Sequence, residues 1–246
     1  MSDRIAIRKC EAIEEFHECV RLQREVWGEA DLEVEPVTLF IVASQTGGQV
    51  IGAFDGDRIV GFTLALAAVR HGSAYLHSHM TGVLAKYRDR GLGRLLKLFQ
   101  REEALGRDIR LIEWTFDPLE GRNAHFNLNR LGAICRKYIP NLYGVTTSPL
   151  HRGLATDRLL AEWALESPRV ITAVSQGHVE PVLEAGRVSL PLDLEERKAK
   201  EPERLGDVQE HLRREFTSWF ERGYAAVGLR SDGRGASYVL APWSDF

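Results

Sequence analysis

The stretch "KYRDRGLGRLLKLFQ", residues 86–100, decides how the rest of the chain is interpreted. It carries three arginines, two lysines and two glycines and then turns into an amphipathic leucine pattern. The segment before it, "AYLHSHMTGVLA", has the composition of a strand, and the segment "IRLIEWTF" after it does too. One face of a helix is marked in between by Leu92, Leu95, Leu96, Phe99 and Leu105. The sequence therefore predicts a strand, a loop, a helix and a second strand.

Glycines occupy the predicted loop between the first strand and the helix. At Gly91 and Gly93 the missing Cβ atoms let the backbone turn tightly and approach a ligand. The N–H groups of residues 89–94 would point out of the helix N-terminus, which carries roughly half a positive charge. Charge-assisted hydrogen bonds can be added by Arg88, Arg90 and Arg94. The pattern favours a pyrophosphate-binding loop. A dinucleotide fingerprint is disfavoured because position 96 is Leu96, and the Gly-Lys-Ser/Thr of a P-loop is absent.

Length, composition and charge limit the classes of protein to which the chain can belong. The 246 residues are 44% hydrophobic, enough for one large domain or for one domain with a smaller appendage. The formal net charge of -3 gives no overall attraction to polyanions, which argues against a nucleic-acid partner. No apolar run approaches the ~20 residues of a membrane span, and "MSDRIAIRKC" lacks the apolar segment of a signal peptide. We therefore expect no membrane partner and a cytoplasmic location.

The cysteines and histidines show no metal-ligand spacing. The chain has three cysteines, Cys10, Cys19 and Cys135, and no CxxC pair. We therefore expect them to be reduced and to pack in the core, and we expect no metal site.

Outward from residues 86–100 the chain is a succession of single elements without repeats. Strands are predicted at residues 4–10, 49–54, 58–69, 134–139 and 158–166, and helices at residues 11–27, 37–45 and 121–132. After Ser167-Pro168 the sequence becomes rich in charged residues and is interrupted by prolines. A helix is predicted near residues 208–223, followed by a hairpin around residues 231–235. The overall class is α/β, with one domain over residues 1–167 and an extension over residues 168–246.

The loop also resembles that of a known family. Arg88-Asp89-Arg90-Gly91-Leu92-Gly93 has the form Q/R-x-x-G-x-G/A and resembles the acyl-CoA pyrophosphate loop of the GCN5-related N-acetyltransferases, the GNAT superfamily. "TGVLAKYRDRGLG" resembles the fourth strand of that family running into its loop, and "NAHFNLNRLGA" resembles a later helix. The resemblance covers residues 4–165. It implies a mixed, mostly antiparallel central sheet flanked by helices, with splayed parallel strands at the donor site, and it leaves the C-terminal α/β extension unexplained.

The resemblance implies which residues hold the donor, acetyl-CoA or another acyl-CoA. Backbone groups of the first splayed strand would bind the pantetheine arm, with an N–H near Val83 polarising the thioester carbonyl. Gly82 suits the bulge that forces the strands apart. The implied donor contacts are Thr81, Val83, Leu84, Arg88, Asp89, Arg90, Gly91, Leu92, Gly93, Arg94, Asn123 and Asn127.

Direct attack by an amine in a ternary complex needs a base and an acid. Base candidates on the two splayed strands are His77, His79, Glu113 and Asp117. His79 is nearest the expected bulge, period-2 alternation puts His77, His79 and Thr81 on one face, and Glu113 can instead pair with an arginine. A structural histidine, with water as the base, is the alternative.

The acid departs from the family pattern. The family often has a tyrosine four residues before the helix-ending glycine, and this chain has Leu128 there. Tyr138 or Tyr143 can approach from the next strand and loop, with Tyr143 our candidate, or else the thiolate leaves unassisted or through water. Packing is an equally open role for Tyr143.

The acceptor is predicted to be a primary amine of an amino acid or similar small metabolite. Arg152 and Arg158 can hold its carboxylate in fork geometry, although both can also be surface charges. Spare arginines would equally suit a succinyl donor, so acetyl and succinyl transfer both stay open. The rival classes are a non-catalytic CoA-binding or interaction module, and a nucleic-acid binder using residues 86–101. A homodimer also stays open.

Overall fold

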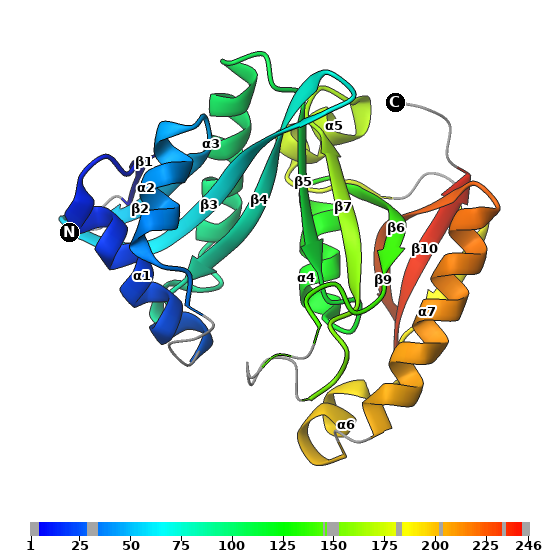
Figure 1. Cartoon of the computed structure of the whole chain (residues 1–246). Coiled ribbons are helices and arrows are strands. Elements are labelled where there is room, and N and C mark those ends of the chain that lie inside the picture. The colour runs from blue at the N-terminus through cyan, green and yellow to red at the C-terminus, as the bar shows by residue number, and fades with distance from the viewer. Residues whose placement is uncertain are drawn as a thin grey trace. The chain divides into compact units, whose positions relative to one another are not determined.

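The computed structural model describes residues 5–28, 34–144, 146, 153–180, 184–201, 204–232 and 235–242 (Figure 1). Their contacts divide the chain into two compact units, one with the described residues up to Glu113 and the other with those from Trp114 onward. The domain boundary predicted after residue 167 stays a prediction.

The first unit is an antiparallel sheet that ends in one parallel pair. Its strands follow the order β1-β2-β3-β4-β5, and β4 and β5 run parallel. Its elements are β1 (Ala6–Lys9), α1 (Ile13–Trp27), α2 (Val37–Gln45), β2 (Gln49–Asp55), β3 (Arg58–Arg70), β4 (Ser73–Val83), the 3-10 turn η2 (Ala85–Tyr87), α3 (Leu92–Leu105) and the start of β5 (Leu111–Phe116). All of these strands and helices were predicted from the sequence within a few residues.

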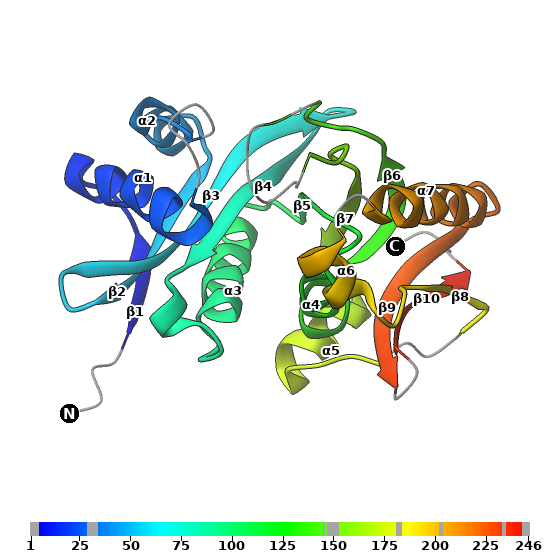
Figure 2. The ribbon, with the colours of Figure 1, turned by 90° about the horizontal axis from the view of Figure 1, so that it is seen from below.

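Helices cover both faces of this sheet. α1 and α2 pack on one face and α3 on the other (Figure 2). α1 buries Phe16, Cys19 and Leu22 and ends at Gly28, whose φ of 66° is the left-handed conformation that glycine adopts without strain. α3 turns Leu92 and Leu96 toward the sheet. The amphipathic spacing of each helix therefore determines which side meets the strands.

The second unit is antiparallel. From the end of β5 its strands follow the order β5-β7-β6-β9-β10-β8. Its elements are α4 (Gly121–His125), the π-helical turn η3 (Phe126–Arg130), β6 (Ile134–Ile139), β7 (Arg158–Ala164), α5 (Pro168–Gln176), β8 (Gly186–Ser189), α6 (Leu194–Lys200), α7 (Leu205–Glu221), β9 (Tyr224–Asp232) and β10 (Gly235–Pro242). The expected hairpin is β9–β10, whereas α5, β8 and α6 were not predicted.

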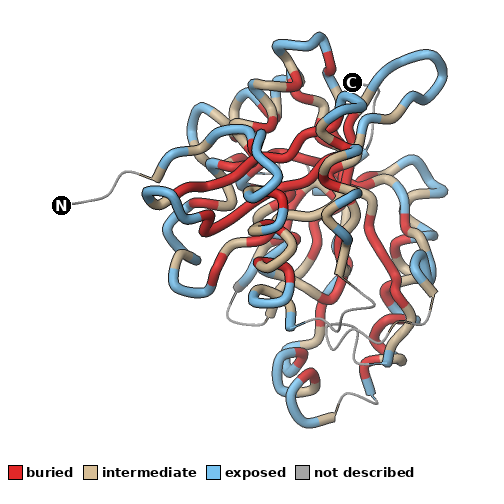
Figure 3. Tube along the Cα trace, turned by 60° about the vertical axis from the view of Figure 1, so that its left-hand side comes forward, coloured by how far each residue is buried: buried red, intermediate tan, exposed pale blue. Residues whose placement is uncertain are grey.

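Buried side chains follow the strands and the inner faces of the helices (Figure 3). In the second unit Phe216 of α7 stacks on Tyr138 of β6 and meets Tyr238 of β10 edge-on, with ring centroids 5.9 and 5.0 Å apart. The cysteines Cys10, Cys19 and Cys135 are free and buried, which confirms their expected packing role.

The mixed α/β architecture, mostly antiparallel with one parallel pair, confirms the predicted fold class. No helix in the described part of the chain is long and apolar enough to span a membrane.

Candidate functional site

A β-bulge interrupts β4 in the first unit. Leu64 of β3 pairs with Met80, but the next residue, Ala65, pairs with Ser78, so His79 is an extra residue on β4. A bulge of this kind bends its strand and changes the direction of its side chains. The bulge therefore gives His79 a position that no other residue of the strand has.

The sequence suggested a bulge at Gly82, and this prediction is wrong. Gly82 pairs with Phe62 in unbroken register. A Cβ added to Gly82 would lie 3.2 Å from the Trp27 ring of α1. Close packing against α1 is thus the physical reason for this glycine.

The bulge also changes which side chains share a face. The rings of His77 and His79 lie 6.3 Å apart, as the period-2 prediction expected. Thr81 lies on the opposite face, where its Oγ1 is 2.8 Å from Oγ1 of Thr63. The prediction that all three share a face is wrong for Thr81, because one extra residue inverts the alternation beyond it.

His79 is paired with a carboxylate that the sequence pattern did not indicate. Its Nε2 lies 2.9 Å from Oε1 of Glu35, which precedes α2, and both side chains are partly exposed. The hydrogen bond with His79 lowers the pKa of Glu35, so that carboxylate is ionised at neutral pH. A carboxylate on one imidazole nitrogen fixes the orientation of the ring, as a base in acid–base catalysis requires.

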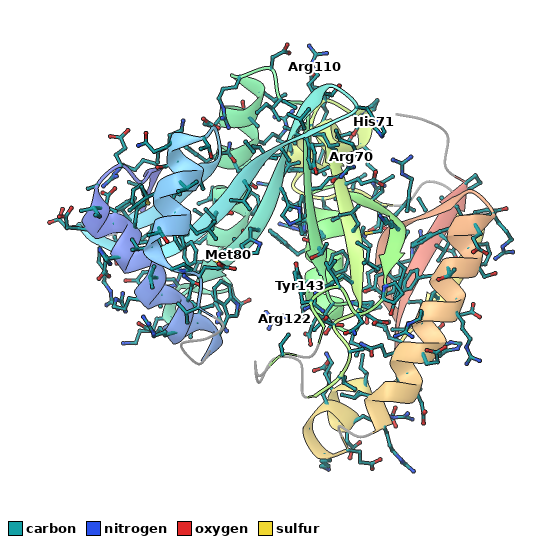
Figure 4. All side chains as sticks on the ribbon, viewed as in Figure 1. Arg70, His71, Met80, Arg110, Arg122 and Tyr143 are labelled. Carbon is teal, nitrogen blue, oxygen red and sulfur yellow. The ribbon has the colours of Figure 1, made fainter. Side chains whose placement is uncertain are left out.

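Glu113 is held by an arginine. Its carboxylate is 1% exposed and accepts two hydrogen bonds from Arg70, at 2.8 and 2.7 Å. Arg70 is labelled in Figure 4 near the end of β3. His77 is in register with Glu113, and burial and the neighbouring His79 lower its pKa, so it is neutral at pH 7. Of the base candidates in this unit, His79 is the one whose carboxylate partner orients it in a partly exposed position.

The end of β4 presents backbone groups on the side away from β3. Leu84 donates its N–H to the carbonyl of Val60 at 3.0 Å. In an antiparallel ladder the pairs alternate, so the N–H and C=O groups of Thr81 and Val83 point away from β3. In the described chain the parallel pairing of β4 with β5 is limited to two residue pairs, which end at His77. The strand thus offers the N–H groups of Thr81 and Val83 on that side. The carbonyl of Val83 already accepts from Arg88, and the N–H of Leu84 is used by β3.

The glycine loop leads into the N-terminus of α3. Gly91 is the N-cap with φ 78°, and no side chain caps the helix there. The first intrahelical bond runs from Leu95 to Gly91, so the N–H groups of residues 92–94 have no partner within the helix. A Cβ on Gly91 would meet no atom within 4 Å, so the space over this helix end is open. These features fit a diphosphate group.

Two arginines flank this helix end. Arg88 donates from Nε to the carbonyl of Val83 at 3.0 Å, which ties the loop to the end of β4. Arg90 lies over the ring of Tyr87 at 5.5 Å, and the Tyr87 hydroxyl donates to Asp55 at 2.5 Å. The other predicted loop residues are Asp89, which has φ 60°, Leu92, which is buried, Gly93 and Arg94. The predicted donor contacts between residues 81 and 94 therefore lie on the end of β4, the loop bonded to it by Arg88, and the first turn of α3.

Lys97 of α3 is a buried lysine. Its side chain is 4% exposed, and Nζ donates to Ser78 Oγ at 2.7 Å and to Gln100 Oε1 at 2.9 Å. Burial lowers the pKa of Lys97 to about 7. The leucine pattern of α3 does not indicate this burial, because a lysine on the buried side of an amphipathic helix usually extends to solvent.

The predicted donor contacts on the later helix lie in the second unit. Asn127 is buried and donates from Nδ2 to Oδ1 of Asn123 at 3.2 Å. Leu128, at the position of the family tyrosine, is fully buried. No phenol is available from that position.

The tyrosine candidates of the second unit have different environments. The Tyr143 hydroxyl lies 3.2 Å from Thr115 Oγ1, and Arg158 lies over the ring at 5.4 Å. Tyr143, labelled in Figure 4, is 48% exposed. Tyr138 is buried and donates to Asp157 at 2.7 Å. Tyr143 is therefore the accessible phenol. Arg152 lies outside the described residues.

Asp117, the remaining base candidate, is also in the second unit. Its Oδ1 accepts from the Leu119 N–H at 2.8 Å, and burial raises its pKa. Among the described residues no group of three or more His, Cys, Asp or Glu side chains is arranged to hold a metal ion.

Comparison of the sequence finds no matching family model and no match among curated proteins. Solved structures do match. A Desulfovibrio desulfuricans protein assigned to the GNAT family of acetyltransferases is 14% identical, with a TM-score of 0.54 over 66% of this chain and 99% of its own. The ribosomal-protein-S18-alanine N-acetyltransferase of Escherichia coli is 13% identical, with a TM-score of 0.52 over 67% of this chain and 96% of its own.

A third match is the Arabidopsis thaliana protein NAA60 in complex with acetyl-CoA, 12% identical with a TM-score of 0.53 over 65% of this chain and 99% of its own. About two thirds of the chain thus match nearly the whole length of each of these proteins. Over that part, the chain has the fold of these three proteins, the first of which is assigned to the GNAT family.

Proposed function

We propose that the chain is an acyl-CoA-dependent N-acyltransferase. It moves an acetyl or succinyl group to a primary amine of an amino acid or similar small metabolite, by direct attack in a ternary complex. The observation that carries this is on one strand: β4 has a histidine paired with a carboxylate at its bulge, and it leads into a helix end with no side-chain cap.

The end of β4 and the start of α3 would each bind one part of acyl-CoA. The α3 N-terminus after Gly91 would hold the diphosphate of acyl-CoA through its backbone N–H groups. The N–H of Val83 would donate to the oxygen on which charge develops during attack. When bound, acyl-CoA supplies an activated thioester carbonyl.

His79 would take the proton that the acceptor's ammonium group must lose for its nitrogen to attack as an amine. Glu35 would stabilise the imidazolium that forms on His79, because its carboxylate lies 2.9 Å from Nε2. Glu113 has a supporting role, because Arg70 occupies both of its oxygens.

The departing thiolate would receive a proton from Tyr143, which is exposed and hydrogen-bonded to Thr115. Arg158, and Arg152 outside the described residues, would hold the carboxylate of the acceptor. The boundary of the catalytic domain after residue 167 belongs to the same proposal.

A second candidate is a non-catalytic CoA-binding or interaction module. Leu128 at the usual tyrosine position favours it. The two functions differ in thioester turnover.

The test is to incubate the chain with acetyl-CoA or succinyl-CoA and a panel of amino acids, and to follow release of free thiol. A peptide beginning with alanine extends the panel, because the Escherichia coli neighbour acts on a protein alanine. Acceptor-dependent thiol release supports the enzyme and identifies acyl group and acceptor. Tight CoA binding without turnover would assign the module.

A further inference from the structure

A cavity of about 410 Å³ lies in the second unit, and the proposed reaction makes no use of it. It is formed where α4 and η3 meet the strands β8 and β9, which Figure 2 labels. The segments that line it are up to about a hundred residues apart in the sequence. The lining residues are His125, Asn129, Glu180, Arg187, Leu229, Arg230 and Ser231.

Asn129 is the buried polar residue of this cavity. It is 1% exposed, and its Oδ1 accepts from the Leu229 N–H at 2.8 Å, which fixes the orientation of its amide. Its own carbonyl accepts from Val179 at 2.8 Å. Because Leu229 uses Oδ1, the side-chain NH2 group is the donor that Asn129 contributes to the cavity lining.

A rare backbone conformation places Asn129 there. Leu131 donates to the carbonyl of Phe126, five residues earlier, at 3.0 Å, so η3 is a π-helical turn. Such turns are uncommon and are frequent at functional sites. An ordinary helical turn would rotate Asn129 relative to the cavity.

Two guanidinium groups, those of Arg187 and Arg230, line the same cavity. Glu184 accepts from Nε of Arg187 and from Nη1 of Arg230, both at 2.5 Å, and so braces the two arginines. Arg230 also has Nε 3.9 Å from Glu180. A guanidinium has five N–H donors, so these two contacts leave Arg230 with donors to spare.

The fourth polar group is an imidazole. His125 stacks on His178 with ring centroids 6.3 Å apart. Burial lowers the pKa of His125, and His178 lowers it further, so the ring is neutral at pH 7 and offers one N–H donor. His178 itself is 2.5 Å from Glu180.

Hydrogen-bond donors of α4, η3, β8 and β9 therefore line one cavity. Its lining carboxylate, Glu180, is paired with His178 and lies 3.9 Å from Arg230, and the carboxylate of Glu184 holds both arginines from outside the lining. We propose that this cavity is a binding site for a small metabolite that carries an oxyanion, a carboxylate or a phosphate group. Its volume is within the range of small-molecule sites.

The test is calorimetric titration of the whole chain with inorganic phosphate and, separately, with acetate, at an ionic strength held constant with sodium chloride. Saturable binding of one probe tells which oxyanion is preferred. Asn129→Asp keeps the acceptor for Leu229 but turns the cavity-facing group from donor to anion, so affinity should fall at least ~10-fold. Arg230→Gln, at a partly exposed residue, should also lower it about 10-fold.

Two controls separate this site from other anion sites. Arg110→Gln removes a surface guanidinium of the first unit, which pairs with Asp108, and should leave the affinity unchanged. Phosphate at the N-terminus of α3 would instead be lost in Gly91→Trp and kept in Asn129→Asp. The inference is overturned if neither probe saturates, or if folded Arg230→Gln and Asn129→Asp both bind like the parent. If Asn129→Asp does not fold, Arg230→Gln decides alone.

Discussion

His79 and Glu35 are joined by a hydrogen bond of 2.9 Å that links the bulge of β4 to the residue preceding Pro36 and α2. They are 44 residues apart in the chain. Both remain partly exposed, so the pair is accessible to a substrate while the imidazole stays oriented.

If His79 is the base, His79→Gln should lower kcat by ~10²-fold or more, because general base catalysis contributes 10²–10⁴-fold. Glu35→Gln keeps a hydrogen-bond acceptor but removes the charge, and a smaller loss of about 10-fold is expected. Acyl-CoA affinity should change little in either. Parental kcat in His79→Gln would mean that water is the base.

Gly91→Trp should abolish CoA binding, since the indole would fill the open space over the α3 N-terminus. Gly72→Trp is the matched control, because Gly72 has φ 79° against 78° and a Cβ there also meets nothing within 4 Å. Both carry the same left-handed strain, so equal unfolding temperatures are expected. Titration with CoA measures the difference. A Gly91→Trp variant that binds CoA like the parent removes the diphosphate assignment.

Tyr143→Phe tests the acid. If the phenol protonates the thiolate, kcat should fall by ~10²-fold with the KM for acyl-CoA nearly unchanged. Thr115→Val removes the hydroxyl 3.2 Å away and keeps the phenol, so its effect should be much smaller. An unaffected Tyr143→Phe would show that the tyrosine only packs.

Lys97 should make stability depend on pH. Its pKa is lowered by burial from 10.5 to about 7, so the unfolded chain binds more protons between these values. The burial penalty is fully present below pH 7, declines as pH rises and is gone above the unfolded value. Urea unfolding of the parent and Lys97→Met at pH 7 and pH 9 should show the parent gaining about 2 kcal/mol relative to the variant. A constant difference would mean that Lys97 titrates normally.

Asp157 should be the most sensitive polar residue of the second unit. It is fully buried and accepts from Tyr138, from the Asn141 N–H and, twice, from Arg213 of α7. Asp157→Ala should lower the free energy of unfolding by roughly 3–5 kcal/mol, since it leaves these donors without an acceptor. Tyr138→Phe, which removes one donor, should cost about 1 kcal/mol. Equal small losses in urea titrations would contradict this.

Local patterns determined most of the first unit. The glycines around Leu92, the leucine spacing of α3 and the alternation in β4 each depend on near neighbours, so the strand, loop and helix were predictable. In the second unit the short elements α5, β8 and α6 were missed, because four to nine residues hold too little periodicity to identify them.

The sequence by itself determined the order of elements in the first unit and the glycine loop at Gly91, because turn and helix signals are local. Only the tertiary structure decided that the bulge lies at His79, that Glu35 reaches it and that Lys97 is buried. It also decided that Asn129 faces a cavity with Arg230. These relationships arise where segments distant in the chain pack together, and no short-range pattern of residue types specifies such register and packing.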